Sequence, residues 1–417
     1  MDKLRIAGGQ PLKGRVRIAG AKNAALPALA ACLLTGETVQ LANMPFVRDV
    51  RTMRRVLEQL GATASAPEEG ALTLKLAEIA SFEAPYDLVK TMRASILVLG
   101  PLVARHGRAR VSMPGGCAIG ERPINYHLEA LARMGAEISL QHGYVEARAE
   151  RLHGATVAFP EKTVTGTENI MMAAALADGT SVLRNCAREP EVVNLAEMLG
   201  AMGASISGAG TDEMIIEGRP QLDGCAHHVI ADRIEAGTYL VAGALAGEDL
   251  EIVGCRAEPL EPVLTQLRSA GVEIDIEGEV MRLSKPERLV AHDLRTGPYP
   301  GYPTDMQAQY MTLMTQAEGA SAVTETIFER RFMHVGELHR MGADIRMDGR
   351  TCVVVGPTPL MGAQVMATDL RASACLVLAA LVADGVTVLD RVYHLDRGYE
   401  AMERKLQELG ASVERIR

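Results

Sequence analysis

Residues 24–34 read Ala24-Ala25-Leu26-Pro27-Ala28-Leu29-Ala30-Ala31-Cys32-Leu33-Leu34. Small and apolar side chains occupy every position, so a helix formed here has no polar side to turn toward water and must be surrounded by protein. Residues 373–382 near the other end of the chain have the same character. Residues 53–60 instead place charged and apolar side chains at helical spacing, which predicts one wet face. The sequence therefore predicts buried helices and surface helices in one protein.

These helices belong to a unit that repeats along the chain. Glycine, a small or β-branched residue and a short strand-like stretch recur at six places, 68 to 74 residues apart: Gly61, Gly135, Gly203, Gly271, Gly342 and Gly410. A second series lies about 25 residues ahead of the first, at the ends of apolar helical stretches: Gly36, Gly107, Gly179, Gly247, Gly319 and Gly385. Glycine is the expected residue just past a helix. Each unit is therefore predicted to run helix, turn, strand, connection, helix, turn, strand.

Six such units cannot share one core comfortably, and three plus three gives two α/β domains of ordinary size. No Gly-, Pro- or Ser-rich linker separates the halves, and the midpoint falls near His227 and His228. The opening stretch, residues 4–18, precedes the first helix and is expected to pair with strands from the other end of the chain. A cleft between the two domains is the expected place for a site.

Composition excludes several classes of function. The chain has 417 residues, 48% hydrophobic, with a net charge of −9, which argues against general nucleic-acid binding. Nine Tyr, five Phe and no Trp in 417 residues argue against a surface on which nucleic-acid bases stack. No signal peptide and no apolar run of about twenty residues is found, so we expect a cytoplasmic protein without a membrane partner. Seven cysteines without a CxxC pair predict neither a disulfide framework nor a metal site.

One cysteine stands apart from the other six. Cys117 lies among Pro114, Gly115, Gly116 and Gly120, residues that cannot build regular structure, so we expect it on an exposed loop, where reactive residues usually lie. A cation five residues on, Arg122, favours a thiolate or holds an anion beside the sulfur. The remaining cysteines lie in or beside apolar segments and are predicted to be buried: Cys32, Cys186, Cys225, Cys255, Cys352 and Cys375.

Polar residues fall where the buried helices are expected to begin: Lys22, Asn23, Arg93, Glu168, Asn169, Arg233, Asp305, Asp369 and Arg371. Helix N-termini carry unpaired N–H groups and a partial positive charge, so several of them at one cleft would bind an anion. For Asp305 or Asp369 alone, an ordinary helix cap is the simpler interpretation. Six cations in loop or helix-start positions favour a ligand with several negative groups: Lys22, Arg93, Arg122, Arg331, Arg371 and Arg397.

Five stretches of this sequence resemble one family: Ala21-Lys22-Asn23-Ala24, Pro114 to Pro123 (PGGCAIGERP), Tyr302 to Gln309 (YPTDMQAQ), Thr324 to Phe332 (TETIFERRF) and Asp369 to Ser373 (DLRAS). They resemble the UDP-N-acetylglucosamine 1-carboxyvinyltransferases, the enolpyruvyl transferases that open bacterial peptidoglycan synthesis, over essentially the full length. The resemblance implies two inside-out α/β barrel-like domains, each of three βαβαββ units, with an active-site cleft between them. It places the first domain at residues 22–229 and the second at residues 1–21 and 230–417.

The implied reaction transfers enolpyruvyl from phosphoenolpyruvate to the 3′-hydroxyl of UDP-N-acetylglucosamine and releases phosphate by addition and elimination. It needs an acid and a base in a dry cleft and no metal or organic cofactor. By resemblance, Cys117 protonates C3 of phosphoenolpyruvate and can add to C2, and Asp305 is the base near the sugar hydroxyl. Lys22, Arg122 and Arg397 match phosphate ligands, while Arg331 and Arg371 match carboxylate ligands. Asp369 is implied to handle protons or to orient Lys22.

The positions that match nucleotide-sugar ligands are Asn23, Arg93, Arg122, Pro123, Ile124, Asn125, Tyr126, Lys162, Thr163, Val164, Thr165, Asp305 and Ile327. The family commonly has Arg-Pro-Val-Asp-Leu where this chain has residues 122–126, so Asn125 replaces a carboxylate and bears on the uracil contact. Glu121 beside Arg122 is a second difference that opposes anion binding. Two other functions stay open: the sister transferase of the shikimate pathway, and a non-catalytic paralogue that binds the nucleotide sugar as a regulatory subunit. The resemblance assigns no oligomeric state.

Overall fold

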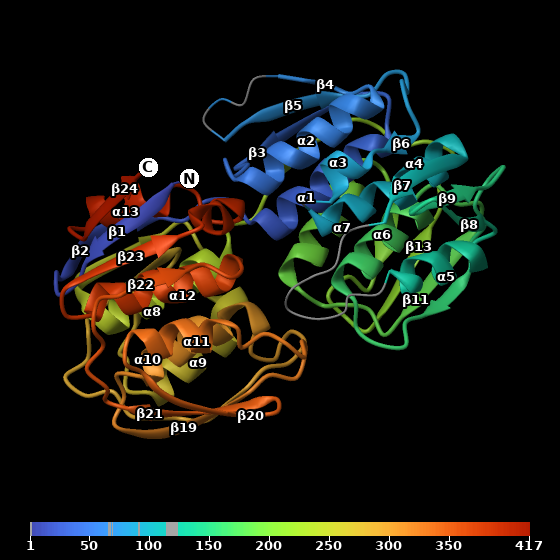
Figure 1. Ribbon diagram of the computed structural model, residues 1–417. Helices are drawn as coiled ribbons and strands as arrows, with labels where there is room; N and C mark the ends of the chain where they lie inside the picture. Colours follow the sequence, from blue (N-terminus) through green and yellow to red (C-terminus); the bar gives the residue numbers. More distant parts are fainter. Residues whose placement is uncertain (1, 66–67, 69, 91, 114–123) are drawn as a thin grey trace. The chain divides into compact units, whose positions relative to one another are not determined.

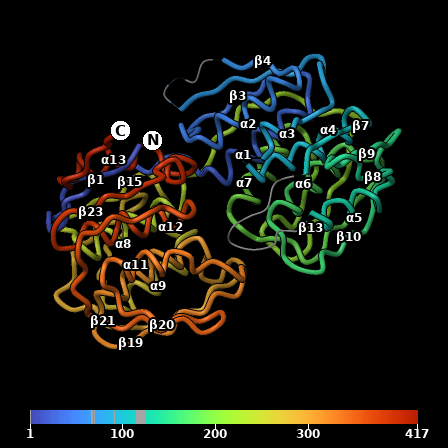
Figure 2. Tube along the Cα trace, in the orientation of Figure 1, coloured from blue at the N-terminus to red at the C-terminus, as the bar shows by residue number. Residues whose placement is uncertain are grey.

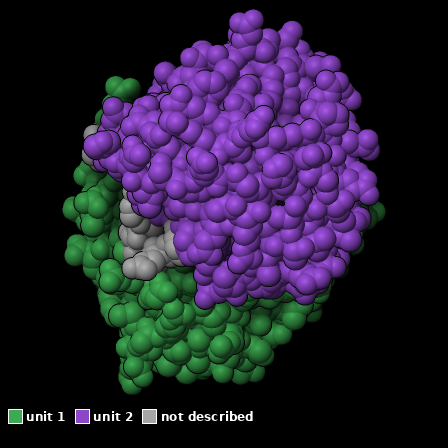
Figure 3. All heavy atoms as spheres, turned by 90° about the vertical axis from the view of Figure 1, so that its right-hand side faces the viewer, with its two compact units in different colours: residues 1–19, 117–121, 231–417 green, residues 20–116, 122–230 purple. Residues whose placement is uncertain are grey.

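The computed structural model describes residues 2–65, 68, 70–90, 92–113 and 124–417, which form two compact units (Figures 1 and 3). Unit 1 contains the described residues up to 19 and from 231 onward, and unit 2 contains those between 20 and 230. Each unit has its own hydrophobic core. The predicted site residues Cys117, Arg122 and Pro123, and the neighbouring Glu121, lie outside the described residues.

Unit 2 is built from three successive repeats. The first contains α1 (Lys22–Ala31), the 3-10 helix η1 (Cys32–Leu34), β3 (Thr38–Ala42), α2 (Arg48–Leu60), β4 (Thr63–Ala64) and β5 (Leu72–Lys75). The second contains β6 (Glu83–Ala84), α3 (Tyr86–Val89), η2 (Arg93–Val98), α4 (Leu99–His106), β7 (Arg108–Ser112), α5 (Asn125–Arg133), β8 (Glu137–Gln141) and β9 (Tyr144–Arg148). The third contains β10 (Thr156–Ala158), α6 (Val164–Ala174), β11 (Thr180–Arg184), α7 (Pro190–Ala201), β12 (Ser205–Ser207) and β13 (Glu213–Glu217), and β14 (Ala226–His228) follows it.

Unit 1 repeats the same order of elements. Its first repeat contains β2 (Leu12–Arg17), α8 (Arg233–Ala246), β15 (Gly247–Val253), η3 (Glu258–Leu260), α9 (Glu261–Ser269), β16 (Asp275–Glu277) and β17 (Val280–Leu283). The second contains β18 (Leu294–Arg295), η4 (Thr304–Met306), α10 (Gln307–Met314), β19 (Gly319–Thr324), α11 (His334–Arg340), β20 (Asp344–Asp348) and β21 (Thr351–Gly356). The third contains β22 (Gln364–Met366), α12 (Leu370–Val382), β23 (Val386–Asp390), η5 (Val392–Arg397), α13 (Met402–Glu408), β24 (Ser412–Ile416) and β1 (Lys3–Ala7).

Six four-stranded sheets of the described residues share one pattern of pairing. In the sheet β10-β11-β13-β12, the first pair is parallel and the next two pairs are antiparallel. The same pattern holds for the sheets β14-β3-β5-β4, β6-β7-β9-β8, β2-β15-β17-β16, β18-β19-β21-β20 and β22-β23-β1-β24. The sixfold repeat predicted from the glycines is therefore confirmed as six βαβαββ units, three in each compact unit.

Strands distant in sequence close each unit. In unit 2, β14 pairs in parallel with β3. In unit 1, β2 pairs with β15, and β1 lies between β23 and β24, with Leu4 opposite both Leu389 and Arg415. The expectation that the opening stretch pairs with the far end of the chain is confirmed for β1, whereas β2 pairs with β15 near the middle of the chain.

The two predicted kinds of helix are both present. In unit 1, α8, α10 and α12 pack against one another, and every residue of α10 is buried. The three helices are labelled in Figure 1, and α8 and α12 can also be followed in Figure 2. In unit 2, α4 packs against α6, and α1 packs against α6 and α7. The surface helix α2 buries Val50, Met53, Val56, Leu57 and Leu60 along one face only. The hydrophobic effect thus places helices at the centre of each unit and sheets outside them.

Ten of the twelve glycines in the two repeating series are required by their backbone conformation, and two glycines of the second series are exceptions. All six glycines of the first series have φ between 94° and 113°, which is left-handed backbone that residues with a Cβ avoid. In the second series, Gly107, Gly179, Gly319 and Gly385 are left-handed, but Gly36 and Gly247 are not. Gly247 has φ −72° and begins β15, where a Cβ would lie 2.6 Å from the carbonyl oxygen of Gly243. Gly247 does follow α8 directly, as predicted, but close packing and not a left-handed backbone angle requires glycine there.

Five of the six cysteines in the described residues are buried, as predicted, whereas Cys225 is half-buried. None of the helices in the described ranges is long and apolar enough to cross a membrane.

Candidate active site

Asp305 lies between two buried arginines in unit 1. It belongs to η4, which turns the chain from Pro303 into α10. Its Oδ1 accepts a hydrogen bond from Nη2 of Arg331 at 2.6 Å, and its Oδ2 accepts two from Arg371, from Nη2 at 2.7 Å and Nε at 3.1 Å. The arginine side chains are 6% and 4% exposed. Both carboxylate oxygens are therefore held by charge-assisted hydrogen bonds, which are stronger than hydrogen bonds between neutral groups.

This arrangement sets the ionisation of the whole cluster. Burial would raise the pKa of the Asp305 carboxyl, but Arg371 and Arg331 outweigh burial and hold the pKa well below its ordinary value. Burial would lower the pKa of Arg371, and Asp305 outweighs it in the opposite direction. One donor of Arg371, Nη1, is buried and makes no hydrogen bond within the described residues. The cluster therefore holds an ionised carboxylate and keeps a guanidinium N–H for a further acceptor.

Asp369 is a helix cap. Its Oδ1 accepts hydrogen bonds from the backbone N–H groups of Arg371 at 2.8 Å and Ala372 at 3.1 Å, the first turn of α12. Asp369 is therefore an N-cap in the structure, as the simpler interpretation of its sequence position predicts, and the cap fixes the start of the helix that carries Arg371. Asp305 is different, because no side chain caps η4 and its carboxylate is committed to the arginines.

Lys22 begins α1 in unit 2 and lies beside an acid that the sequence did not single out. Its Nζ is 3.2 Å from Oδ2 of Asp49, and the two side chains are 12% and 5% exposed. Asp49 belongs to the first turn of α2, where an acidic residue is common for reasons of helix stability alone. Only the fold, which packs α1 against α2, distinguishes it.

A buried histidine, His127, contacts Thr165 and lies within the electrostatic influence of Arg93. His127 Nδ1 lies 2.9 Å from Nδ2 of Asn169, whose Oδ1 accepts from the N–H of Gly100. The amide must therefore donate to Nδ1, so the neutral ring carries its proton on Nε2, which faces Thr165 Oγ1 at 3.4 Å. Burial, and then the charge of Arg93, lower the pKa of His127 to about 4. This ring is thus a fixed donor to one of the predicted nucleotide-sugar ligands.

The other predicted ligands have mixed surroundings. Lys162 forms an ion pair with Asp212 and donates to the carbonyl oxygen of Cys186 at 3.0 Å. Thr163 caps α6 by accepting from the N–H of Gly166 at 3.2 Å, and Val164 is the first residue of that helix. Lys162 and Thr163 therefore both help to hold the entry into α6.

Residues at the start of α5 and in η5 complete the set. Ile124 precedes α5, which begins with the exposed Asn125 and the half-buried Tyr126. Arg397 ends η5, and its neighbour Asp396 is held by Arg415 through hydrogen bonds of 2.6 and 3.1 Å. The predicted residues thus divide between unit 1 (Asp305, Ile327, Arg331, Asp369, Arg371 and Arg397) and unit 2 (Lys22, Asn23, Arg93, Ile124, Asn125, Tyr126, Lys162, Thr163, Val164 and Thr165).

One placement at a helix start is wrong. Glu168 and Asn169 lie inside α6, which begins four residues earlier, and both are fully buried. Burial, and then the nearby Glu191 and Glu189, raise the pKa of Glu168 well above its ordinary value. Asn169 orients His127, as described above.

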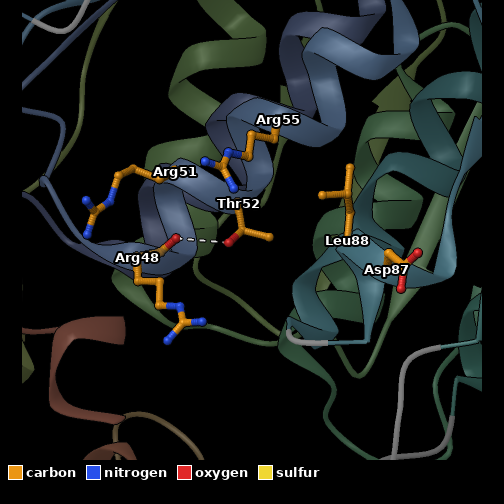
Figure 4. Close-up of a pocket in the computed structure, with 6 residues that line it drawn as sticks. All are labelled: Arg48, Arg51, Thr52, Arg55, Asp87 and Leu88. Carbon is orange, nitrogen blue, oxygen red and sulfur yellow. Dashed lines mark hydrogen bonds between the residues drawn. The ribbon is translucent and has the colours of Figure 1, made fainter. Parts of the chain in front are cut away.

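A basic cavity of about 410 Å³ lies between α2 and α3 in unit 2 (Figure 4). It is lined by Arg48, Arg51, Thr52 and Arg55 of α2 and by Asp87 and Leu88 of α3, and Figure 4 shows the three arginines fanning out in different directions. None of the predicted site residues lines it. Within the described ranges, no group of three or more His, Cys, Asp or Glu side chains could hold a metal ion.

Comparison with known proteins places the chain. Residues 6–406 match the family model described as EPSP synthase (3-phosphoshikimate 1-carboxyvinyltransferase). The enolpyruvyl transferase NikO from Streptomyces tendae superposes with a TM-score of 0.91 at 28% identity, covering 99% of this chain and 98% of that one. EPSP synthase from Acinetobacter baumannii, at 17% identity and a TM-score of 0.77 with both chains fully covered, shares the fold. The chain belongs to this family of enolpyruvyl transferases.

Within the family, its sequence groups with one kind of member. The UDP-N-acetylglucosamine 1-carboxyvinyltransferase of Solibacter usitatus is 58% identical over the full length of both chains. The protein of the same name from Koribacter versatilis is 56% identical, covering all of this chain and 97% of that one. The family resemblance found in the five sequence stretches is confirmed.

Proposed function

We propose that the protein transfers the enolpyruvyl group of phosphoenolpyruvate to the 3′-hydroxyl of UDP-N-acetylglucosamine and releases phosphate, the step that commits the sugar nucleotide to peptidoglycan. The single observation that carries the proposal is the 56–58% identity, over the full chain, with proteins that bear the name of this activity. Asp305 between Arg331 and Arg371 supports it, because an enolpyruvyl donor is an anion with a carboxylate that two guanidiniums match.

In the proposed addition step, C3 of phosphoenolpyruvate gains a proton from the thiol of Cys117, which lies outside the described residues. The sugar oxygen bonds to C2 and its proton passes to Asp305, giving a tetrahedral intermediate. In the elimination step C3 returns a proton to the Cys117 thiolate and the double bond between C2 and C3 forms again. The bond from C2 to the phosphate oxygen breaks, and the proton held by Asp305 leaves with the phosphate. Every proton borrowed from the protein in addition is returned in elimination, so no cofactor is consumed.

Asp305 can act as a base only if its two arginines find another partner. While both guanidiniums hold it, the pKa of its carboxyl is too low to take a proton from a sugar hydroxyl. A substrate carboxylate on Arg331 and Arg371 supplies that partner, since it brings the same charge and the same planar pair of oxygens. Binding of the donor therefore prepares the base for the acceptor.

Lys22, Arg122 and Arg397 are assigned to the phosphate, with Asp49 holding Lys22 until the anion arrives. Thr165, backed by His127, and Ile327 are assigned to the nucleotide sugar, together with Asn23, Arg93, residues 122–126 and residues 162–164. We place the protein in the cytoplasm, a reducing compartment, which fits the six unbridged cysteines of the described chain.

The test is phosphate release from phosphoenolpyruvate in the presence of UDP-N-acetylglucosamine, on the natural chain and on Cys117→Ser. Activity in the first and severe loss in the second support the proposal. Binding of the sugar nucleotide without phosphate release would instead support a regulatory paralogue. Turnover only with shikimate 3-phosphate would show that the substrate is wrong.

A further inference from the structure

Glu325 is a fully buried acid that follows β19 and that the resemblance assigns no role. Its side chain has no exposed surface. Its Oε1 accepts the backbone N–H groups of Ile327 at 2.8 Å and Phe328 at 3.1 Å, and its Oε2 accepts the hydroxyl of Thr304 at 2.7 Å. A buried carboxylate is retained at low cost only when it is hydrogen-bonded in this way.

The hydroxyl of Thr304 connects this acid to the Asp305 cluster. It donates its only proton to Glu325 and accepts a hydrogen bond from Nη1 of Arg331 at 2.9 Å. The other terminal nitrogen of Arg331, Nη2, donates to Asp305. Because an ionised carboxylate only accepts, Glu325 fixes the direction of the Thr304 hydroxyl, so that its lone pair faces the guanidinium.

Arg331 is therefore held at three points. The Thr304 hydroxyl and the Asp305 carboxylate take its two terminal nitrogens, and the ring of Phe328 lies 5.2 Å from the guanidinium carbon. Glu325 fixes two of the three, Thr304 through its hydroxyl and Phe328 through its backbone N–H. If a substrate carboxylate replaces Asp305 at Nη2, the Nη1 contact with Thr304 is unaffected, and the guanidinium plane keeps its orientation.

We propose that Glu325 and Thr304 are positioning residues of the transferase reaction, which act by holding the guanidinium of Arg331 in the plane that both Asp305 and the substrate carboxylate require. This inference rests on the proposed function and adds to it two residues that touch no reacting atom. The Glu325 carboxylate also accepts the N–H of Ile327, a predicted contact of the nucleotide sugar. Glu325 therefore helps to position both the loop at Ile327 and Arg331, the predicted ligand of the phosphoenolpyruvate carboxylate.

The test uses three variants of the two residues. Thr304→Val removes the hydroxyl at nearly equal volume, and Thr304→Ser keeps a hydroxyl at the same position. Glu325→Gln leaves an oxygen for the two N–H groups but removes the acceptor for Thr304. The matched control is Thr324→Val in β19, whose hydroxyl lies 3.0 Å from that of Thr351 and contacts none of these groups. The four variants and the natural chain are compared by steady-state kinetics for each substrate and by calorimetry of phosphoenolpyruvate binding.

We expect Thr304→Val and Glu325→Gln to raise KM for phosphoenolpyruvate about 10-fold, with a smaller change in kcat and in KM for UDP-N-acetylglucosamine. The acid limb of the pH profile should move to higher pH, because a loosened Arg331 suppresses protonation of Asp305 less. Thr304→Ser and Thr324→Val should match the natural chain.

Unchanged KM and pH profile in Thr304→Val and Glu325→Gln would overturn the inference. The inference would also be overturned if kcat/KM fell equally for both substrates, the melting temperature fell and the acid limb of the pH profile did not move. That result would assign the two residues a structural role. If the natural chain releases no phosphate, the proposed function fails, and calorimetry then decides the inference alone: weaker phosphoenolpyruvate binding in the two variants upholds it, and equal binding overturns it.

Discussion

Arg371 donates two hydrogen bonds to one oxygen of Asp305, Oδ2, from Nη2 at 2.7 Å and from Nε at 3.1 Å. Arg371 is buried and the Asp305 side chain is 26% exposed, so a carboxylate at the edge of the protein neutralises a buried guanidinium in place of a substrate. The two groups therefore compete with substrate binding. Removing the charge of Asp305 should strengthen the binding of an anion to Arg371, although it also removes the proposed base.

Asp305→Asn should separate binding from chemistry. Two buried guanidiniums lose their counter-charge, so the free energy of unfolding should fall by about 3 kcal/mol. Phosphate release should fall at least about 100-fold because the base is lost, while phosphoenolpyruvate binds more tightly and stabilises the variant more than the natural chain. Calorimetry and thermal unfolding with and without phosphoenolpyruvate measure this. Asp293→Asn, which alters an exposed carboxylate that accepts from Ala322, is the control. Weaker binding of phosphoenolpyruvate by Asp305→Asn would contradict the proposal that the substrate carboxylate replaces Asp305 on the two arginines.

Acid should destabilise the fold through its buried histidines. Burial, and then Arg93, lower the pKa of His127 to about 4, whereas the pKa of the unfolded side chain is about 6.5. The unfolded state therefore binds the proton first, so stability is fully present above about pH 6.5 and falls as the pH drops toward 4, by about 3 kcal/mol in all. Urea unfolding between pH 4 and 8 measures the slope, which should be shallower in His127→Gln. An equal slope in both proteins would show that His127 is charged in the folded state.

A buried ion pair and a surface ion pair in unit 1 should differ sharply in their effect on stability. Glu235 is buried, accepts Nζ of Lys405 at 2.7 Å, and has its pKa raised by burial despite that lysine. Lys405→Met leaves this carboxyl without its charge partner and should cost about 3 kcal/mol of unfolding free energy. Lys3→Met removes the exposed pair with Asp390, 41% and 38% exposed, and should cost less than about 1 kcal/mol. Equal losses in chemical denaturation would contradict the burial argument.

Lys22 and Asp49 should be energetically coupled. The side chains of this pair are nearly buried and 3.2 Å apart, so each single change leaves the other charge poorly compensated. In a double-mutant cycle of Lys22→Met and Asp49→Asn, the double variant should lose about 1–3 kcal/mol less than the sum of the single losses. Strict additivity in chemical denaturation would mean that the two charges do not interact.

The repeat was predictable because its signal is local. Each left-handed turn such as Gly135 or Gly203 needs a residue without Cβ, and each buried helix needs small apolar side chains, so both leave a mark at fixed spacing. Gly247 shows the limit of this signal, because a glycine required by close packing looks the same in sequence as one required by backbone angle.

The cluster around Asp305 was predictable only in part. Asp305, Arg331 and Arg371 stand in motifs that the family resemblance marks. Thr304 and Glu325 stand in the same motifs, but they act through a contact across 21 residues, and a threonine and a glutamate next to a strand or turn have many ordinary explanations. Asp49 was hidden for a similar reason, since an acid in the first turn of a helix needs no partner to explain it.

Unit 2 is an insertion between the second and third strands of unit 1 along the chain, because β1 and β2 precede it and α8 follows it. The ends of unit 2 meet each other: the N–H of Ala21 donates to the carbonyl oxygen of Ile230 at 2.7 Å. On the ribosome, residues 20–230 can therefore complete all their sheets while unit 1 has only two strands to offer. Strand β1 must wait for β23 and β24, more than 370 residues further along the chain, so the sheet that contains β1 can form only after residues 386–416 have been made.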